Sequence, residues 1–266
     1  METTLDQSKI AATENNELTE VPFDIIPLPS EGLLYPNGKK TIKVSYMTSK
    51  CENILTSPNL IRSGKVLDKL MEMCVKDPEI KVGDLLTGDR NQIMIFLRST
   101  GYGSIYPVRI MDPETGIEFD TEVDLDLLKT KGIDGTPDDN MEFSFTLPLS
   151  KKKLKFKLLT SSEGEVILRK VEDMMKLTGN DGISPLLTTR LSTMVTQVDQ
   201  QRDNIYIDGF IENMIAGDSL SLRLEIDRVE PGVNMEYTFT SPSGKKFQQT
   251  VPISADFFFP TQINTK

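Results

Sequence analysis

Residues 42–49 of the chain read IKVSYMTS, and residues 154–161 read LKFKLLTS. Both stretches begin with alternating apolar and polar residues and end in a Thr-Ser pair, at a constant offset of 112 residues. The same offset places residues 90–93 (RNQI) on residues 202–205 (RDNI). A fixed offset between similar segments indicates an internal repeat, and each copy of a repeat specifies one supersecondary unit.

A second pair of segments extends the repeat toward the end of each copy. Residues 112–119 (DPETGIEF) reappear as residues 241–247 (SPSGKKF), where the offset has grown to 128–129. The second copy therefore holds an insertion of about 16 residues. Because strand-like and helix-like patterns both occur in each copy, we expect an α+β fold. It would consist of two tandem, diverged copies of a strand–helices–β-hairpin unit.

Composition shifts along the chain define the expected units. Residues 1–20 form a flexible acidic arm, and residues 21–128 form the first α+β repeat. Residues 129–141, which contain the run Asp-Gly-Thr-Pro-Asp-Asp-Asn, are a linker. Residues 142–260 form the second repeat, and residues 261–266 form a polar tail. Units of this size are large enough to bury a core of their own.

The net charge of −10 is concentrated near the N-terminus, where residues 1–31 hold seven acids and one base. This arm either stays solvated and disordered or becomes ordered against a basic partner. An acidic chain repels phosphate groups, which disfavours nucleic acid as a partner. No apolar run approaches the roughly 18 residues that a membrane span needs, and no secretory signal is present. We therefore expect a cytoplasmic protein without a membrane partner.

The chain contains two cysteines, Cys51 and Cys74, and no histidine. A nucleophile–imidazole pair and a histidine-containing zinc site are therefore both excluded. In a cytoplasm the two thiols stay reduced, and we expect them to be small buried hydrophobic side chains. No phosphate-binding loop is present either. The sequence predicts no catalytic residue, cofactor or metal ion.

Capping signals set the expected order of elements. Three residue pairs have the spacing of a capping box: Ser49 with Glu52, Asp89 with Gln92, and Thr160 with Glu163. The expected helices include residues 62–76, a helix from Asp89 to Gly101, residues 161–177 and residues 204–215. The expected strands include residues 41–47, 105–111, 117–127, 154–158 and 221–229.

Residues 118–127 (EFDTEVDLDL) alternate strictly between carboxylates and other side chains. In a strand, this period of two places Glu118, Asp120 and Glu122 on one face together with two further acids. Such a row suits a solvated outer face, an acidic stripe that binds a partner, or a metal or catalytic site. A catalytic pair needs two different environments, whereas one strand face provides a single environment.

Residues 151–157 (KKKLKFK) form a basic counterpart in the second copy. Alternation places Lys153, Lys155 and Lys157 on one strand face. This face is either solvated or binds a partner, and it could lie beside the acidic strand in the same or a neighbouring molecule. The overall acidity and the lack of interleaved aromatic residues argue against a nucleic-acid stripe.

Two further features concern turns and the C-terminus. Residues 112–116 and 241–244 have the frame of a zinc knuckle, but they lack its cysteines, so they cannot hold zinc. Phe257, Phe258 and Phe259 form an aromatic cluster near the C-terminus. They either dock into a groove of their own chain or anchor a partner, because buried aromatics dominate interface energies.

Several segments together resemble the baseplate hub assembly proteins of T-even-type contractile-tailed bacteriophages. The segments are residues 28–36 (LPSEGLLYP), 85–90 (LLTGDR), 97–103 (LRSTGYG), 123–125 (VDL) and 257–260 (FFFP). The resemblance spans residues 22–260 and lies in the ordered set rather than in one motif. Members of that family carry the cysteine knuckles that this chain lacks.

The resemblance implies a non-enzymatic assembly factor, or chaperone, that acts late in infection in the host cytoplasm. It would bind other tail proteins and build the central hub of the baseplate. Two alternatives remain, namely a permanent structural subunit of the virion baseplate and a hydrolase that uses the carboxylates of residues 118–126. The expected partner-binding residues are those of the acidic strand, the lysine strand and the aromatic cluster. The oligomeric state and the partner are left open.

Overall fold

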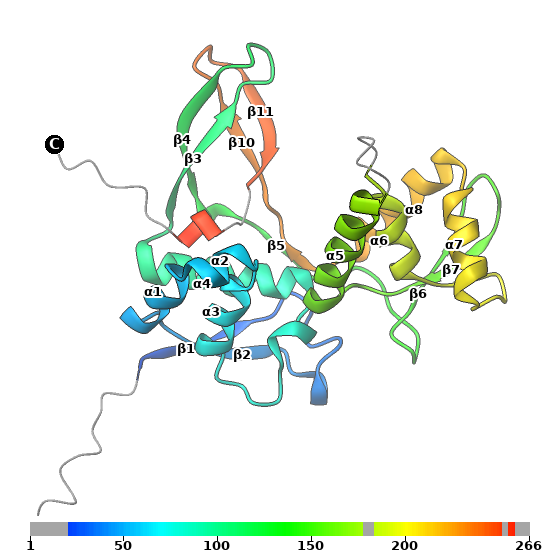
Figure 1. Cartoon of the computed structure of the whole chain (residues 1–266), viewed down its shortest axis with the longest axis horizontal. Coiled ribbons are helices and arrows are strands. Elements are labelled where there is room, and N and C mark those ends of the chain that lie inside the picture. Colours follow the sequence, from blue (N-terminus) through cyan, green and yellow to red (C-terminus); the bar gives the residue numbers. More distant parts are fainter. Residues whose placement is uncertain (1–20, 178–183, 252–254, 259–266) are drawn as a thin grey trace, which may run out of the picture.

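The computed structural model describes residues 21–177, 184–251 and 255–258 of the chain. Helices pack on small antiparallel sheets of two or three strands, so the predicted α+β class is confirmed. Figure 1 shows two bodies side by side, with two β-hairpins standing up together from the first. The predicted acidic arm and polar tail lie outside the described residues.

The first body is built mainly from the N-terminal half of the chain. In its first hairpin Ile26 lies opposite Ile42, and both side chains are buried. The half-buried strand predicted at residues 41–47 is thus present, and short helices cover its apolar face. The elements are β1 Phe23–Pro27, β2 Thr41–Ser45, α1 Ser49–Leu55, α2 Pro58–Arg62, α3 Val66–Cys74, α4 Thr87–Tyr102, β3 Ile105–Met111, β4 Glu118–Asp124 and β5 Thr130–Lys131.

The second body is built around a three-stranded sheet with the strand order β6–β7–β8. Leu154 and Phe156 of the central strand are buried, which the alternating lysines of this segment predict. Its elements are β6 Phe143–Thr146, β7 Lys153–Phe156, α5 Ser161–Leu177, α6 Leu186–Met194, β8 Val195–Val198, α7 Asn204–Glu212 and α8 Ala216–Val229. The chain then continues through β9 Gly232–Val233 and a last hairpin of β10 Glu236–Thr240 and β11 Lys246–Thr250.

One expected element is wrong. Residues 221–229 belong to helix α8 rather than to a strand, and Leu222, Ile226 and Val229 are buried at helical spacing. The helix expected at residues 62–76 is present as α3, which begins at Val66 because Gly64 adopts a φ of +69° before it; the separate short helix α2 was not expected. The other expected helices are present, with ends that shift by a few residues.

Each body has its own hydrophobic core. The first core gathers side chains from Ile26 to Leu125, and the second gathers side chains from Phe143 to Val229 together with Leu86. The last hairpin, β10–β11, packs with the first core through Phe239 and the following Val251. The chain therefore returns to the first body after completing the second. The predicted repeat and linker boundaries stay a prediction.

The two halves share an arrangement of backbone contacts. In the first, Val75 directly follows α3 and bridges to Val44 of β2. In the second, β8 directly follows α6 and pairs with β7 in the same antiparallel sense. Both halves also end in a hairpin, β3–β4 or β10–β11. Origin from one duplicated unit stays a prediction that these correspondences favour.

A buried carboxylate holds the first body together. Asp89 in the first turn of α4 is 0% exposed, and it accepts hydrogen bonds from Ser30 N at 2.9 Å and Tyr35 Oη at 2.6 Å. Tyr35 Oη in turn accepts a bond from Leu86 N at 2.9 Å. Burial raises the pKa of Asp89, although these hydrogen bonds act in the opposite direction. Asp89 thus clamps the turn after β1 to α4 instead of forming the expected capping box with Gln92.

Asp218 has the same position in the second body. It lies in the first turn of α8, is 0% exposed, and accepts bonds from Leu149 N at 2.8 Å and Ser150 N at 2.9 Å. Burial tends to raise its pKa, but the hydrogen bonds from Ser150 and Leu149 lower the pKa overall. Each of the two aspartates follows a glycine and accepts hydrogen bonds from the turn of the preceding hairpin. The two aspartates lie 129 residues apart, the same spacing as Asp112 and Ser241.

Close backbone contacts join the two bodies. A Cβ atom on Gly88 would lie 1.9 Å from Pro231 O, so the start of α4 and the segment before β9 meet without side chains between them. On the other side of this junction, Ser161 N and Ser161 Oγ both donate to Leu85 O. The segment of residues 85–88 therefore contacts both the start of α5 and the end of α8.

Tyr35→Phe should destabilise the protein. The change leaves the Asp89 carboxylate and Leu86 N each short of a partner in a buried site, which costs about 2–3 kcal/mol. Urea unfolding would measure the loss. Tyr46→Phe is the matched control, because Tyr46 Oη donates to Asp24 at an exposed site, and its stability should be nearly unchanged. Equal losses in the two variants would contradict the clamp.

Gly88→Ala should lower stability by about 3 kcal/mol or more, because the added methyl group collides with backbone atoms that cannot rotate away. Gly164→Ala is the control, since nothing lies within 4 Å of its Cβ position within α5. That variant should gain up to about 1 kcal/mol from helix propensity. A Gly88→Ala protein as stable as the wild type in thermal unfolding would overturn this description of the junction.

Candidate protein-binding surfaces

The two hairpins that stand up from the first body form one unit, here called the tower (β3–β4 and β10–β11; Figure 1). Tyr106, Val108 and Ile110 of β3 are buried, and they alternate with exposed residues. Phe119 of β4 and Phe247 of β11 meet edge to face, with ring centroids 6.3 Å apart. At the hairpin tips, Lys245 forms an ion pair with Glu114. The tower thus has an apolar interior and is closed at its tip.

The C-terminal aromatics fasten the base of the tower. Phe257 and Phe258 are both 0% exposed, and the ring of Phe257 lies 4.8 Å from that of Tyr106. Both side chains dock within their own chain, as one of the two sequence hypotheses describes. Their predicted contact with a partner would require this segment to leave its site, and it stays a prediction. Phe259 lies outside the described residues.

The acidic strand forms an outer face of the tower. Glu118, Asp120 and Glu122 are exposed on β4, and the strand ends at Asp124 rather than at residue 127. Arg109 on β3 donates to both carboxylate oxygens of Asp120, at 2.7 and 3.1 Å. These bonds hold the pKa of Asp120 below its usual value. Glu118 and Glu122 form no ion pair with a described residue.

The lysine strand lies away from the acidic strand. Strand β7 pairs with β6 and β8 in the second body, and nearby acids compensate much of its charge. Lys155 Nζ lies 2.5 Å from Asp138, and Lys157 forms an ion pair with Glu163. Lys153 is exposed. The two charged strands therefore do not lie side by side within the described chain, and their pairing with a neighbouring molecule stays a prediction.

A paired carboxylate lies beside the lysine strand. Glu142 is buried, and its two oxygens accept bonds from Arg202 Nη1 and Nη2 at 2.9 and 2.8 Å. The Arg202 hydrogen bonds lower the pKa of Glu142, while burial opposes this effect. Lys155 Nζ lies 3.9 Å away and adds a second cation. The pair ties the linker end of β6 to the segment before α7.

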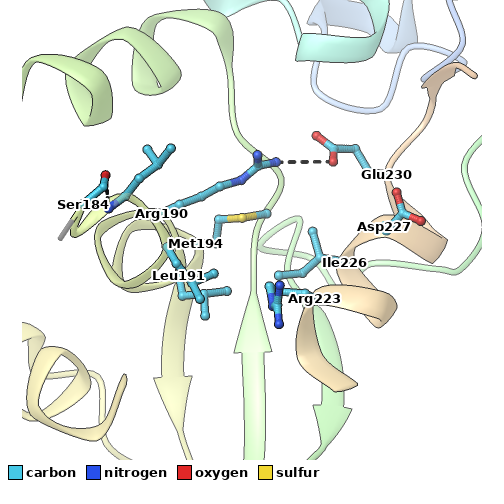
Figure 2. Close-up of a pocket in the computed structure, with 10 residues that line it drawn as sticks. Ser184, Arg190, Leu191, Met194, Arg223, Ile226, Asp227 and Glu230 are labelled. Carbon is cyan, nitrogen blue, oxygen red and sulfur yellow. Dashed lines mark hydrogen bonds and ion pairs between the residues drawn. The ribbon is translucent and has the colours of Figure 1, made fainter. Parts of the chain in front are cut away.

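A groove opens between α6 and α8, with a volume of about 560 Å³. Figure 2 shows Leu191, Met194 and Ile226 within it and Arg190 reaching across to Glu230, at 3.6 Å. Burial raises the pKa of Glu230, and the facing Arg190 acts against that rise. Leu186 and Leu187 line the α6 side, and each is about two-fifths exposed. Apolar side chains dominate this groove.

The described residues were also compared with the requirements of a reactive thiol, a metal site and a membrane span. Cys51 and Cys74 are buried with their sulfurs 3.7 Å apart, and burial raises the pKa of Cys74 to about 12. Within the described ranges, no group of three or more cysteine or carboxylate side chains is arranged to hold a metal ion. None of the helices described is long and apolar enough to cross a membrane. The cavities described do not include Glu118, Asp120 or Glu122.

Sequence reasoning missed the structural roles of Tyr35, Asp89 and Asp218. A signal was available, because a Gly-Asp pair begins both α4 and α8. It also missed the exposed face of α8, since residues 221–229 were expected to form a strand. Leu220 and Leu224 are 49% and 61% exposed there, an unusual placement for two leucines one turn apart.

The described part of the chain combines two projecting hairpins with helices that expose several apolar side chains. Residues 32–200 match the family described as T4 bacteriophage base plate protein. The match covers more than half of the chain, and the chain belongs to this family. No curated protein and no solved structure matches it. Its role is therefore structural or in assembly, within a phage tail baseplate and in contact with other baseplate or tail proteins.

Glu142→Gln should change the dependence of stability on pH. Because the folded pKa of Glu142 is lowered from 4.5, its contribution is complete above that pH and is lost as the pH falls through the folded value. Water screens the half-exposed Arg202, so the loss near neutral pH should be about 1 kcal/mol. Wild type and variant should converge at low pH in urea unfolding. A constant difference at every pH would contradict the assignment.

Proposed function

We propose that this protein is a non-enzymatic assembly factor that binds other tail proteins and helps to build the central hub of the baseplate. The observation that carries the proposal is the tower, which projects from the first body and has a closed apolar interior. A rigid arm of this kind presents its outer side chains without further ordering, and this lowers the entropic cost of binding. The partner is expected in the host cytoplasm, before the tail is complete.

The outer face of β4 supplies the chemistry of recognition. Glu118 and Glu122 are exposed and form no ion pair in the described chain, while Met111 and Ile117 beside them are 53% and 67% exposed. A partner with basic side chains around an apolar centre would complement this face, because opposite charges across an interface select the partner. The lysine strand is less suited to this role, since Lys155 and Lys157 already have acidic partners.

A carboxylate-dependent hydrolase has less support. Glu118, Asp120 and Glu122 share one exposed strand face and line none of the described cavities. A hydrolytic pair needs one carboxyl group with a raised pKa in a concave site. The pKa of Asp120 is instead lowered by Arg109. This arrangement favours binding over catalysis.

A permanent subunit of the virion baseplate is the second candidate, because the family is described as a base plate protein. The two roles differ in whether the protein stays in the particle. Quantitative mass spectrometry of purified virions should find the chain absent or substoichiometric if it is an assembly factor. A fixed stoichiometric amount per tail would instead establish the subunit.

Capture of partners tests the role of the tower. The tagged full chain should retain at least one tail protein of its phage during co-purification. Reversing two charges on β4, by Glu118→Lys with Glu122→Lys, should weaken that capture about tenfold because of like-charge repulsion. The matched control is Glu172→Lys with Glu212→Lys, which makes the same charge change at exposed positions on α5 and α7.

The control variant should capture the partner as the wild type does. If the wild type retains no tail protein, the assembly proposal is wrong. Unchanged capture by the β4 variant would leave assembly standing but move the interface away from the acidic strand.

A further inference from the structure

Two cysteines from different helices are in contact inside the first core. Cys51 lies in α1, and Cys74 is the last residue of α3. Their sulfur atoms lie 3.7 Å apart, and the two residues are 2% and 0% exposed. The chain contains no further cysteine, so each thiol has the other as its one disulfide partner within the molecule.

The geometry of this contact suits a disulfide bond. The sulfurs are at van der Waals distance, and a bond length of about 2.0 Å requires them to approach by roughly 1.7 Å. Because the two side chains come from separate helices, rotation about both Cα–Cβ bonds shares this movement. The Cys51 sulfur also contacts Met73 Sδ at 3.6 Å and Thr48 Oγ1 at 3.8 Å. A flexible methionine beside the pair adapts to such a shift.

The surroundings give the two thiols different roles. Burial raises the pKa of Cys74 to about 12, and the neighbouring Cys51 acts in the same direction, so Cys74 keeps its proton. Cys51 is nearer the surface, because its contacts Thr48 and Met73 are only partly buried. Helix α1 has seven residues and no side-chain hydrogen bond at its N-cap, and so short a helix opens locally at low cost. A small neutral oxidant therefore reaches Cys51 first.

We propose that Cys51 and Cys74 form an oxidation site at which hydrogen peroxide converts the two thiols into a disulfide that joins α1 to α3. The Cys51 sulfur attacks one peroxide oxygen and becomes a sulfenic acid, while the O–O bond breaks and the other oxygen leaves as water with the Cys51 proton. The Cys74 sulfur then attacks the Cys51 sulfur. The S–O bond breaks, and the hydroxyl leaves as a second water with the Cys74 proton. The two thiols lose two electrons in all, and one peroxide is reduced to two waters.

The disulfide would restrain the part of the first body that has the shortest helices. It closes a loop over residues 51–74, which contains the whole of α2. Such a link removes disorder from the unfolded chain and thereby favours the folded state. Reductants of a host cytoplasm keep the thiols reduced, whereas lysis of the host exposes a baseplate protein to an oxidising medium. The site lies in the first core, so it goes beyond the proposed function and does not depend on it.

Peroxide treatment of the reduced full chain tests the proposal. The peroxide dose is one that removes both thiols from the chain unfolded in urea. In the folded wild type, thiols counted after denaturation should fall from two to none, and peptide mapping should find Cys51 linked to Cys74 in the same molecule. The oxidised protein should melt about 5 °C or more above the reduced protein. Dithiothreitol should abolish both changes, which it would not do for methionine sulfoxide.

Two single variants separate the roles of the thiols. Cys74→Ala removes the thiol that resolves the intermediate, so Cys51 should stay a sulfenic acid that dimedone traps. Cys51→Ala should leave Cys74 reduced at the same peroxide dose, because Cys74 is 0% exposed. Neither variant should show the thermal shift. Circular dichroism checks that both are folded, and the measurements on the wild type decide the proposal if either is not.

Three results would overturn the proposal. They are a folded wild type that keeps both thiols at the chosen dose, oxidation that links different molecules instead of Cys51 to Cys74, and a disulfide that leaves the melting temperature unchanged or lowers it. Dimedone labelling of Cys74 in the Cys51→Ala variant would contradict the assigned order of attack. Capture of tail proteins by the tower is measured separately, so failure of one proposal leaves the other open to its own test.

Discussion

The burial of one carboxylate organises the rest of this molecule. A charged group without partners in an apolar interior is costly, so Asp89 is tolerated only with Ser30 and Tyr35 in their observed places. Tyr35 Oη also accepts a hydrogen bond from Leu86 N, and the Leu86 side chain belongs to the second core. A continuous series of hydrogen bonds therefore connects the first hairpin, the start of α4 and the second body. The adjoining Gly88 allows the backbone before β9 to approach this junction.

A rigid junction gives the two bodies separate surfaces in a defined relation. The first body carries the tower, whose charged outer strand faces solvent. The second body presents leucines on α8 and α6. The two bodies therefore expose different side chains, charged on the tower and apolar on α6 and α8.

The sequence predicted helix ends correctly where the structure depends on interactions between residues a few positions apart. The Thr160–Glu163 pair forms the expected capping box, with Thr160 N donating to Glu163 at 3.0 Å. Helix α4 ends before Gly103, whose φ of +87° requires glycine. Asp89 was misjudged because its partners lie 54 and 59 residues away in the chain. In α8, the alternation of apolar and polar residues resembles the pattern of a strand. The segment is a helix, and it packs on the second core through the residues at helical spacing, Leu222, Ile226 and Val229.

The sequence by itself determined the α+β class, the order of most elements, the hairpin turns and the charge of each outer face. These depend on interactions within a few residues, which composition and spacing express directly. Only the tertiary structure decided that the last hairpin returns to the first body, that Phe257 and Phe258 are buried beneath it, and that Leu220 and Leu224 remain exposed along α8. Burial depends on what packs against a residue, and no local pattern specifies that neighbour.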